Sequence, residues 1–235
     1  MAKKSKKPEV GTDLEKVVLE TVKLNNTPDT AVIKFKLTDP DARMPEYAHE
    51  GDAGMDVYAC GVEYDEEHDT YIYHTGVSYE SEPGIVSYGV ARSSNCYTDS
   101  YLTNGVGVID CATFRGSIQY RYKNRTDIMT RAKENALVEM ATLPWWKKLF
   151  KTSDELRVMY EQYLAKWYEW HVSHALAYAP YEPGDKVGQI IFSRFVTANA
   201  QEVDELSPST RGRGGFGSTG LPKNSKKKIS ILFNI

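Results

Sequence analysis

The sequence has no long hydrophobic run. Of its 235 residues, 41% are hydrophobic and 26% are charged. No apolar segment approaches the length of about 20 residues that a membrane-spanning helix needs, and the basic N-terminus is not followed by the apolar core of a signal peptide. We therefore expect a cytoplasmic protein with no membrane partner, of a length that suits one domain or one domain with an insertion.

Cysteine is also scarce, with only Cys60, Cys96 and Cys111 in the whole chain. Their odd number and wide spacing match neither a disulfide framework nor the ligand pattern of a structural zinc site. We predict that all three are free thiols in a reducing compartment.

The sequence lacks a large excess of charge of either sign, since its formal net charge is only -3. This balance argues against a nucleic-acid binder driven by overall charge, and we expect no sequence-specific nucleic-acid partner. Basic runs stand at 3–7 and 226–228. We interpret them as solvated tail segments, with contact to DNA as the open alternative.

Short β patterns fill the first half of the chain. Residues 31–37 alternate with period two, and segments such as 70–74 and 84–88 are separated by Gly76 and by the Pro83-Gly84 step. This spacing predicts a mainly β domain of the barrel or sandwich kind.

From 127 to about 178 the strand period gives way to helix signals. Thr152 and Glu155 form a capping-box pattern, and Pro144 interrupts the region. We predict a helical insertion between two strands of the β domain, with His171 and His174 as core or surface histidines because nothing nearby completes a metal site. A stripe of large side chains recurs at helical spacing and is typical of a core or a subunit contact: Leu156, Met159, Tyr160, Tyr163, Leu164, Trp167 and Trp170.

These patterns predict five consecutive parts. They are an N-terminal tail (1–29), the first part of the β domain (30–126), the helical insertion (127–180), the second part of the β domain (181–206) and a Gly-rich arm with a tail (207–235).

The segment 105–116 combines an apolar, glycine-interrupted run with a single carboxylate, and we predict that it forms a β-hairpin. Asp110 stands where the strand leaves the core. Such a residue either forms a turn by hydrogen bonding to its own backbone or acts as a positioned base, and the residue alone leaves both open.

Three other stretches carry groups suited to phosphate. Arg92, Ser93 and Ser94 offer a guanidinium and two hydroxyls, which form either a phosphate grip or a polar turn. Gln189 is a polar residue in an apolar strand and needs a buried partner or a ligand. Residues 211–220 contain five glycines, whose exposed backbone N–H groups suit a phosphate.

The order of these segments resembles the trimeric dUTPase (deoxyuridine 5'-triphosphate nucleotidohydrolase) family. Five family motifs match in sequence, at 53–56, 91–94, 105–116, 184–192 and 211–220. The resemblance implies a β-clip or jelly-roll fold and a homotrimer whose sites combine all three subunits. It also implies hydrolysis of dUTP to dUMP and pyrophosphate, which limits uracil in DNA and supplies dUMP for thymidylate synthesis.

The resemblance also implies roles for individual residues. Asp110 is the expected base for the attacking water, Mg²⁺ the expected cofactor, and Asp56 is expected near that ion through a water molecule. The expected phosphate contacts are Arg92, Ser93, Ser94, Gln189, Arg211, Ser218 and Thr219. The expected contacts to uracil and deoxyribose are Asn104, Gly105, Val108, Ile109, Phe114, Phe216 and Gly217, with Phe216 covering the base.

Two features depart from the family pattern. Phe114 stands four residues after Asp110, where the family usually has a tyrosine three residues after the base, so the expected packing against the sugar is in question. The helical insertion is the second departure. Inserts occur in some phage-encoded relatives, which favours a viral origin and therefore the host cytoplasm.

Two alternative functions remain. One is a dCTP deaminase, which shares the trimeric fold. The other is a dUTP-switched binding module that contacts a protein partner through 127–178.

Overall fold

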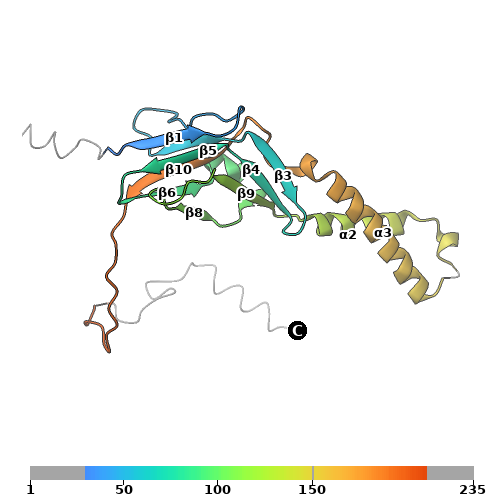
Figure 1. Cartoon of the computed structure of the whole chain (residues 1–235). Helices are drawn as coiled ribbons and strands as arrows, with labels where there is room; N and C mark the ends of the chain where they lie inside the picture. Colours follow the sequence, from blue (N-terminus) through green and yellow to red (C-terminus); the bar gives the residue numbers. More distant parts are fainter. Residues whose placement is uncertain (1–29, 150, 211–235) are drawn as a thin grey trace, which may run out of the picture. The chain divides into compact units, whose positions relative to one another are not determined.

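The computed structural model describes residues 30–149 and 151–210. The chain separates into two compact units, Met1–Val196 and Thr197–Ile235. Every helix and strand of the described residues belongs to the first unit (Figure 1).

The first unit is built mainly from short antiparallel strands, as the sequence predicts, and the insertion is helical. The strands form three sheets, in which every pairing is antiparallel. The first and smallest sheet pairs β1 (Ile33–Leu37) with β5 (Val77–Ser81). The second sheet has the strand order β2 (Gly54–Tyr58), β10 (Lys186–Arg194), β6 (Ile85–Val90) and β8 (Val106–Ile109). The third sheet has the strand order β3 (Gly61–Asp65), β4 (Thr70–His74), β9 (Gln119–Asn124) and β7 (Ser100–Leu102).

The predicted hairpin at 105–116 is wrong. Strand β8 pairs with β6, whereas β9, the next strand along the chain, pairs with β4 and β7 in the other sheet. The segment between β8 and β9 therefore crosses from one sheet to the other. The local pattern of glycines and apolar residues does not specify which distant strand becomes the hydrogen-bonding partner.

Tyrosines of β4 and β9 fill much of the core between the sheets. Tyr71, Tyr73, Tyr120 and Tyr122 are each at most 3% exposed. The Tyr73 hydroxyl donates to the Tyr181 carbonyl at 3.1 Å and accepts the Tyr181 N–H at 3.0 Å. Because a buried hydroxyl needs a hydrogen-bond partner, these rings hold specific backbone groups as well as filling space.

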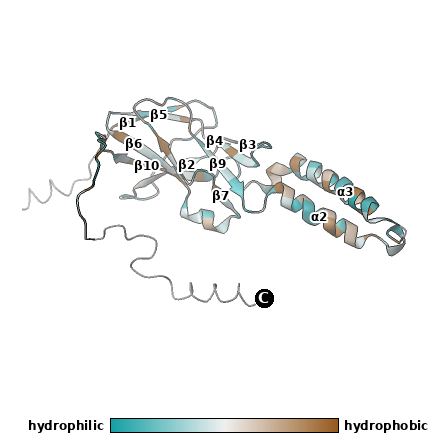
Figure 2. Cartoon of the chain, turned by 90° about the horizontal axis from the view of Figure 1, so that it is seen from below, coloured by the Kyte–Doolittle hydropathy of each residue, from teal (hydrophilic) through white to brown (hydrophobic). Residues whose placement is uncertain are grey.

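The insertion consists of helices α2 (Ile128–Thr142) and α3 (Ser153–Ser173), joined through a 3₁₀ turn at Trp145–Lys147. Thr152 and Glu155 form the predicted capping box at the start of α3. Figure 2 shows hydrophobic and hydrophilic residues mixed along both helices. Hydrogen bonds at the base of the insertion join it to the sheets: the Tyr71 hydroxyl donates to the Ala175 carbonyl at 3.1 Å, and Asn124 donates to the Tyr178 carbonyl at 2.9 Å.

The histidines of the insertion differ in burial, since His171 is buried and His174 is exposed, and the cysteines are free as predicted. His171 is 3% exposed and bonds to Asn135 and the Tyr178 hydroxyl, each at 2.9 Å, while His174 stacks on Trp170. In the described part of the chain, no helix is long and apolar enough to cross a membrane.

Candidate active site

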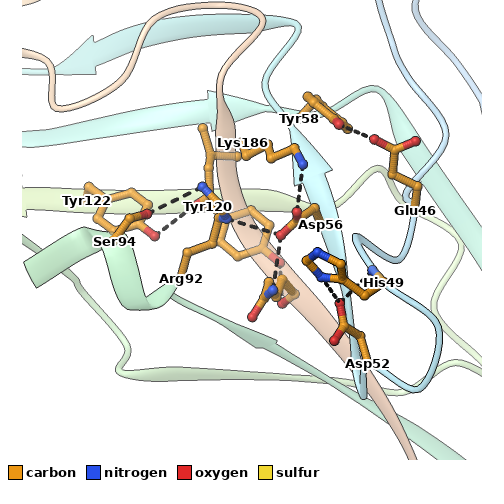
Figure 3. Close-up of polar contacts among 12 residues, drawn as sticks. Glu46, His49, Asp52, Asp56, Tyr58, Arg92, Ser94, Tyr120, Tyr122 and Lys186 are labelled. Atoms are coloured by element: carbon orange, nitrogen blue, oxygen red, sulfur yellow. Dashed lines mark hydrogen bonds and ion pairs between the residues drawn. The ribbon is translucent and has the colours of Figure 1, made fainter.

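Asp56 is the centre of a buried polar cluster in the second sheet. Its side chain lies on β2 and is 1% exposed. Oxygen Oδ1 accepts hydrogen bonds from Arg92 Nε at 3.1 Å and Gln189 Nε2 at 3.0 Å, and Oδ2 accepts one from Lys186 Nζ at 2.9 Å (Figure 3). One carboxylate thus holds two cations and an amide.

A β-bulge in β10 makes this convergence possible. Lys186 lies opposite Tyr58 and Gly188 opposite Val57, so β10 has one residue more than β2 between these pairs. In a regular strand, positions 186 and 189 would point to opposite faces because side chains alternate. The bulge resets this alternation, and both side chains reach Asp56.

The charges of the cluster are mutually stabilised. Burial alone would raise the pKa of Asp56, but hydrogen bonds from Lys186 and Gln189 and the charge of Arg92 outweigh burial and lower this pKa. The same hydrogen bond to Asp56 raises the pKa of Lys186. With one anion against two cations, the cluster keeps a net positive charge suited to an anionic ligand.

Arg92 also joins the cluster to the short 3₁₀ helix η1 (Ser93–Tyr97), which follows β6. Its Nη1 donates to the Ser94 hydroxyl at 3.3 Å, and its side chain is 29% exposed. The structure thus brings Arg92, Ser94 and Gln189 together, while Ser93 is exposed beside them.

A separate cavity of about 360 Å³ lies beside β8. Four of the predicted base and sugar contacts line it: Asn104, Val108, Ile109 and Phe114. Gly105 has φ of +66° at the turn that leads into β8, a conformation that favours glycine. Phe114 reaches the cavity in spite of the extra residue that separates it from Asp110.

Asp110 follows β8 directly and is exposed. Its backbone carbonyl accepts the N–H groups of Thr113 at 3.0 Å and Phe114 at 2.8 Å, which closes a tight turn. Its carboxylate makes no hydrogen bond or ion pair with residues 30–149 or 151–210. The backbone thus forms the turn, and the side chain remains available to a ligand or a water molecule.

The cavity and the Asp56 cluster are distinct within one chain. Among the described residues, no hydrogen bond or ion pair joins Asp110 or Asn104 directly to Asp56, Arg92 or Gln189. Five predicted contacts lie outside the described residues: Arg211, Phe216, Gly217, Ser218 and Thr219.

Sequence reasoning missed two residues of this region. Lys186 stands in a motif that the sequence marked, but its spacing of three from Gln189 indicates opposite faces unless the bulge is known. Tyr120 lines the cavity and also donates from its hydroxyl to the Gln189 carbonyl at 2.8 Å. The sequence showed only that Tyr120 belongs to a strand in which apolar and polar residues alternate.

Comparisons with known proteins show which proteins have a similar sequence. A deoxyuridine 5'-triphosphate nucleotidohydrolase of Clostridium tetani is 27% identical over 188 residues, which cover 80% of this chain and 96% of the relative. The mitochondrial enzyme of that name from Dictyostelium discoideum is 58% identical over a short match of 38 residues, 16% of this chain and 21% of the relative. No family model matches the chain.

The fold has a counterpart among solved structures. The dUTPase of Staphylococcus bacteriophage 80alpha, solved with dUPNHPP, superposes with a TM-score of 0.53 at 21% identity and covers 82% of this chain and 100% of its own. This likeness supports the fold, and the match to the Clostridium tetani relative extends along about four fifths of the sequence. The chain is thus similar in sequence to deoxyuridine 5'-triphosphate nucleotidohydrolases and in fold to a phage dUTPase.

Proposed function

We propose that this protein hydrolyses dUTP to dUMP and pyrophosphate, limiting uracil in DNA and supplying dUMP. Asp110 removes a proton from a water molecule, which attacks the α-phosphorus. The observation that carries this proposal is the exposed Asp110, which directly follows Ile109 in the lining of a cavity of about 360 Å³. A positioned base contributes about 10²–10⁴ in rate, so charge stabilisation supplies much of the remainder.

The substrate lies across the two groups of residues. Asn104 and the backbone of Gly105, Val108 and Ile109 bind uracil, and the Phe114 ring packs against deoxyribose. Arg92, Ser93, Ser94 and Gln189 hold the phosphates. In the proposed trimer, the arm of a neighbouring subunit adds phosphate contacts from Arg211, Ser218 and Thr219, with Phe216 and Gly217 over the base.

We also propose that the protein is a homotrimer. Asp110 and the Asp56 cluster have no direct bond within the described part of one chain, and a site shared between subunits would bring such groups together on one substrate. Measuring the mass of the purified protein in solution tests this. A stable monomer that hydrolyses dUTP at full rate would contradict it.

Mg²⁺ is the proposed cofactor, but the residues do not fit a direct protein site. Both oxygens of Asp56 already accept hydrogen bonds from Arg92, Lys186 and Gln189. The described residues contain no group of three or more His, Cys, Asp or Glu placed to hold an ion. We propose that Mg²⁺ arrives on the triphosphate oxygens of dUTP, so EDTA should leave the melting temperature of the nucleotide-free protein unchanged.

Product analysis tests the hydrolysis and separates it from deamination. Incubation with dUTP should release dUMP and pyrophosphate, and a panel of nucleotides with and without Mg²⁺ should show preference for dUTP. A deaminase needs a glutamate beside the base, and no Glu lies among the described residues that line the cavity. Uracil products from dCTP would reverse this assignment.

We propose, second, that the insertion binds a protein partner. Its tip exposes Trp145 by 66% and Trp146 by 61%, next to the exposed Leu149. No acidic residue occurs between Met140 and Thr152, while Lys147, Lys148 and Lys151 do. This chemistry suits an acidic protein surface with an apolar groove.

Deleting 127–178 and rejoining the flanking strands tests the role of the insertion. If hydrolysis and trimerisation survive, the insertion serves a partner. Collapse of the trimer would assign it to assembly instead.

A further inference from the structure

Tyr120 connects the two sheets at the site. It lies on β9 in the third sheet and is 3% exposed, yet its ring lines the cavity beside β8. Its hydroxyl donates to the backbone carbonyl of Gln189 on β10, in the second sheet, at 2.8 Å (Figure 3 shows Tyr120 beside the Asp56 cluster). Burial raises the pKa of Tyr120 well above its ordinary value, so the hydroxyl keeps its proton.

Gly188 makes room for this ring. A Cβ at Gly188 would stand 2.1 Å from Cε1 of Tyr120, which no side chain allows without displacing the ring. Gly188 also lies at the bulge that turns Gln189 toward Asp56. The absence of a side chain at Gly188 therefore lets the Tyr120 ring pack directly against the bulged part of β10.

We propose that Tyr120 is a positioning residue that couples the base cavity to the phosphate contacts. Its ring forms part of the wall of the cavity that is proposed to bind uracil, and its hydroxyl bonds to the β10 backbone at Gln189. The Gln189 amide then donates to Asp56 at 3.0 Å, and Asp56 binds Arg92 at 3.1 Å. This inference rests on the proposed function because it takes Gln189 and Arg92 as phosphate contacts.

A matched pair of variants tests the coupling. Tyr122 lies on the same strand, is fully buried and donates its hydroxyl to the Val187 carbonyl at 2.7 Å, but it does not line the cavity. Tyr120→Phe and Tyr122→Phe each remove a β9 hydroxyl that donates to a backbone carbonyl of β10. We expect similar losses in melting temperature, but only Tyr120→Phe should weaken binding of the non-hydrolysable analogue dUPNHPP, by about three- to ten-fold.

Deoxyuridine serves as the second ligand, because it has the base and sugar without phosphates. Its inhibition constant should be unchanged in Tyr120→Phe, which keeps the ring, and raised in Gly188→Ala, which displaces the ring. Equal effects of Tyr120→Phe and Tyr122→Phe on dUPNHPP binding would overturn the inference, as would equal weakening of both ligands by Tyr120→Phe. If the unaltered protein neither hydrolyses dUTP nor binds dUPNHPP, the proposed function fails, and the inference with it.

Discussion

The β sheets and the helical insertion are stabilised in different ways. In the sheets, buried tyrosines donate their hydroxyls to backbone carbonyls of distant segments, as Tyr120 and Tyr122 do to β10. In the two helices, the buried residues are Ile128, Ala132 and Ala136 of α2 and His171 of α3. Side-chain hydrogen bonds thus connect the strands across the core of the sheets, whereas the two helices bury only a few, mostly small side chains.

Both regions expose apolar side chains, among them Val32 and Val108 in the β part of the chain. The insertion leaves Leu137 58%, Val138 60% and Trp146 61% exposed in the single chain. Exposed apolar side chains gathered in one region typically mark a contact with another molecule. The sheets thus hold the proposed chemistry, and the insertion carries the exposed apolar side chains on which the proposed partner binding rests.

The largest expected effect separates the chemistry from the fold. Asp110→Asn keeps the size of the side chain but removes the base, so the rate of dUTP hydrolysis should fall by about 10²–10⁴. The carboxylate is exposed, so the melting temperature should not change. Release of pyrophosphate measures the rate, and full activity of the variant would contradict the proposed mechanism.

The next effect concerns the stability of the sheets. Tyr73→Phe leaves the Tyr181 carbonyl and N–H without their buried partner, which should cost about 1–3 kcal/mol of the free energy of unfolding. Denaturant unfolding measures this cost. A matched change in the insertion, Tyr163→Phe, removes a hydroxyl from a half-buried ring and should cost less. Equal costs would show that tyrosine hydroxyls stabilise the two regions to a similar degree.

Acid should weaken the insertion before the sheets. Burial, with the nearby charges of Arg131 and His174, lowers the pKa of His171 below its ordinary value of 6.5. Below pH 6.5, His171 therefore binds a proton in the unfolded chain but not in the folded chain. The free energy of unfolding falls as the pH drops from 6.5 toward the pKa of His171 in the folded state.

Circular dichroism of the helices during thermal unfolding at several pH values checks this expectation. In His171→Gln the midpoint should depend less on pH over the same range. An unchanged pH dependence in that variant would show that another group is responsible.

The smallest expected effect is at the tip of the insertion. Trp145 is 66% exposed, so Trp145→Ala should change the free energy of unfolding by no more than about 0.5 kcal/mol. The rate of dUTP hydrolysis should also stay the same. A large loss of stability would mean that Trp145 is covered in the assembled protein, and the tip would then belong to the assembly.

Local patterns in the sequence predicted much of this structure. The strand at 70–74 and the capping box of Thr152 and Glu155 appear at the predicted residues, because period-two alternation and helix caps depend on neighbours along the chain. The predicted hairpin at 105–116 failed because the choice of strand partner depends on residues far away in the sequence.

The sequence by itself determined the β character and the helical insertion, and its short, ordered motifs indicated the resemblance to dUTPases and the candidate site residues. Only the tertiary structure decided that Lys186 joins Gln189 at Asp56 and that Tyr120 links the cavity to β10. The first depends on a bulge that reverses the alternation of one strand, and the second on the space left by Gly188 beneath a ring from another sheet. Both are contacts across the fold, which spacing along the chain does not encode.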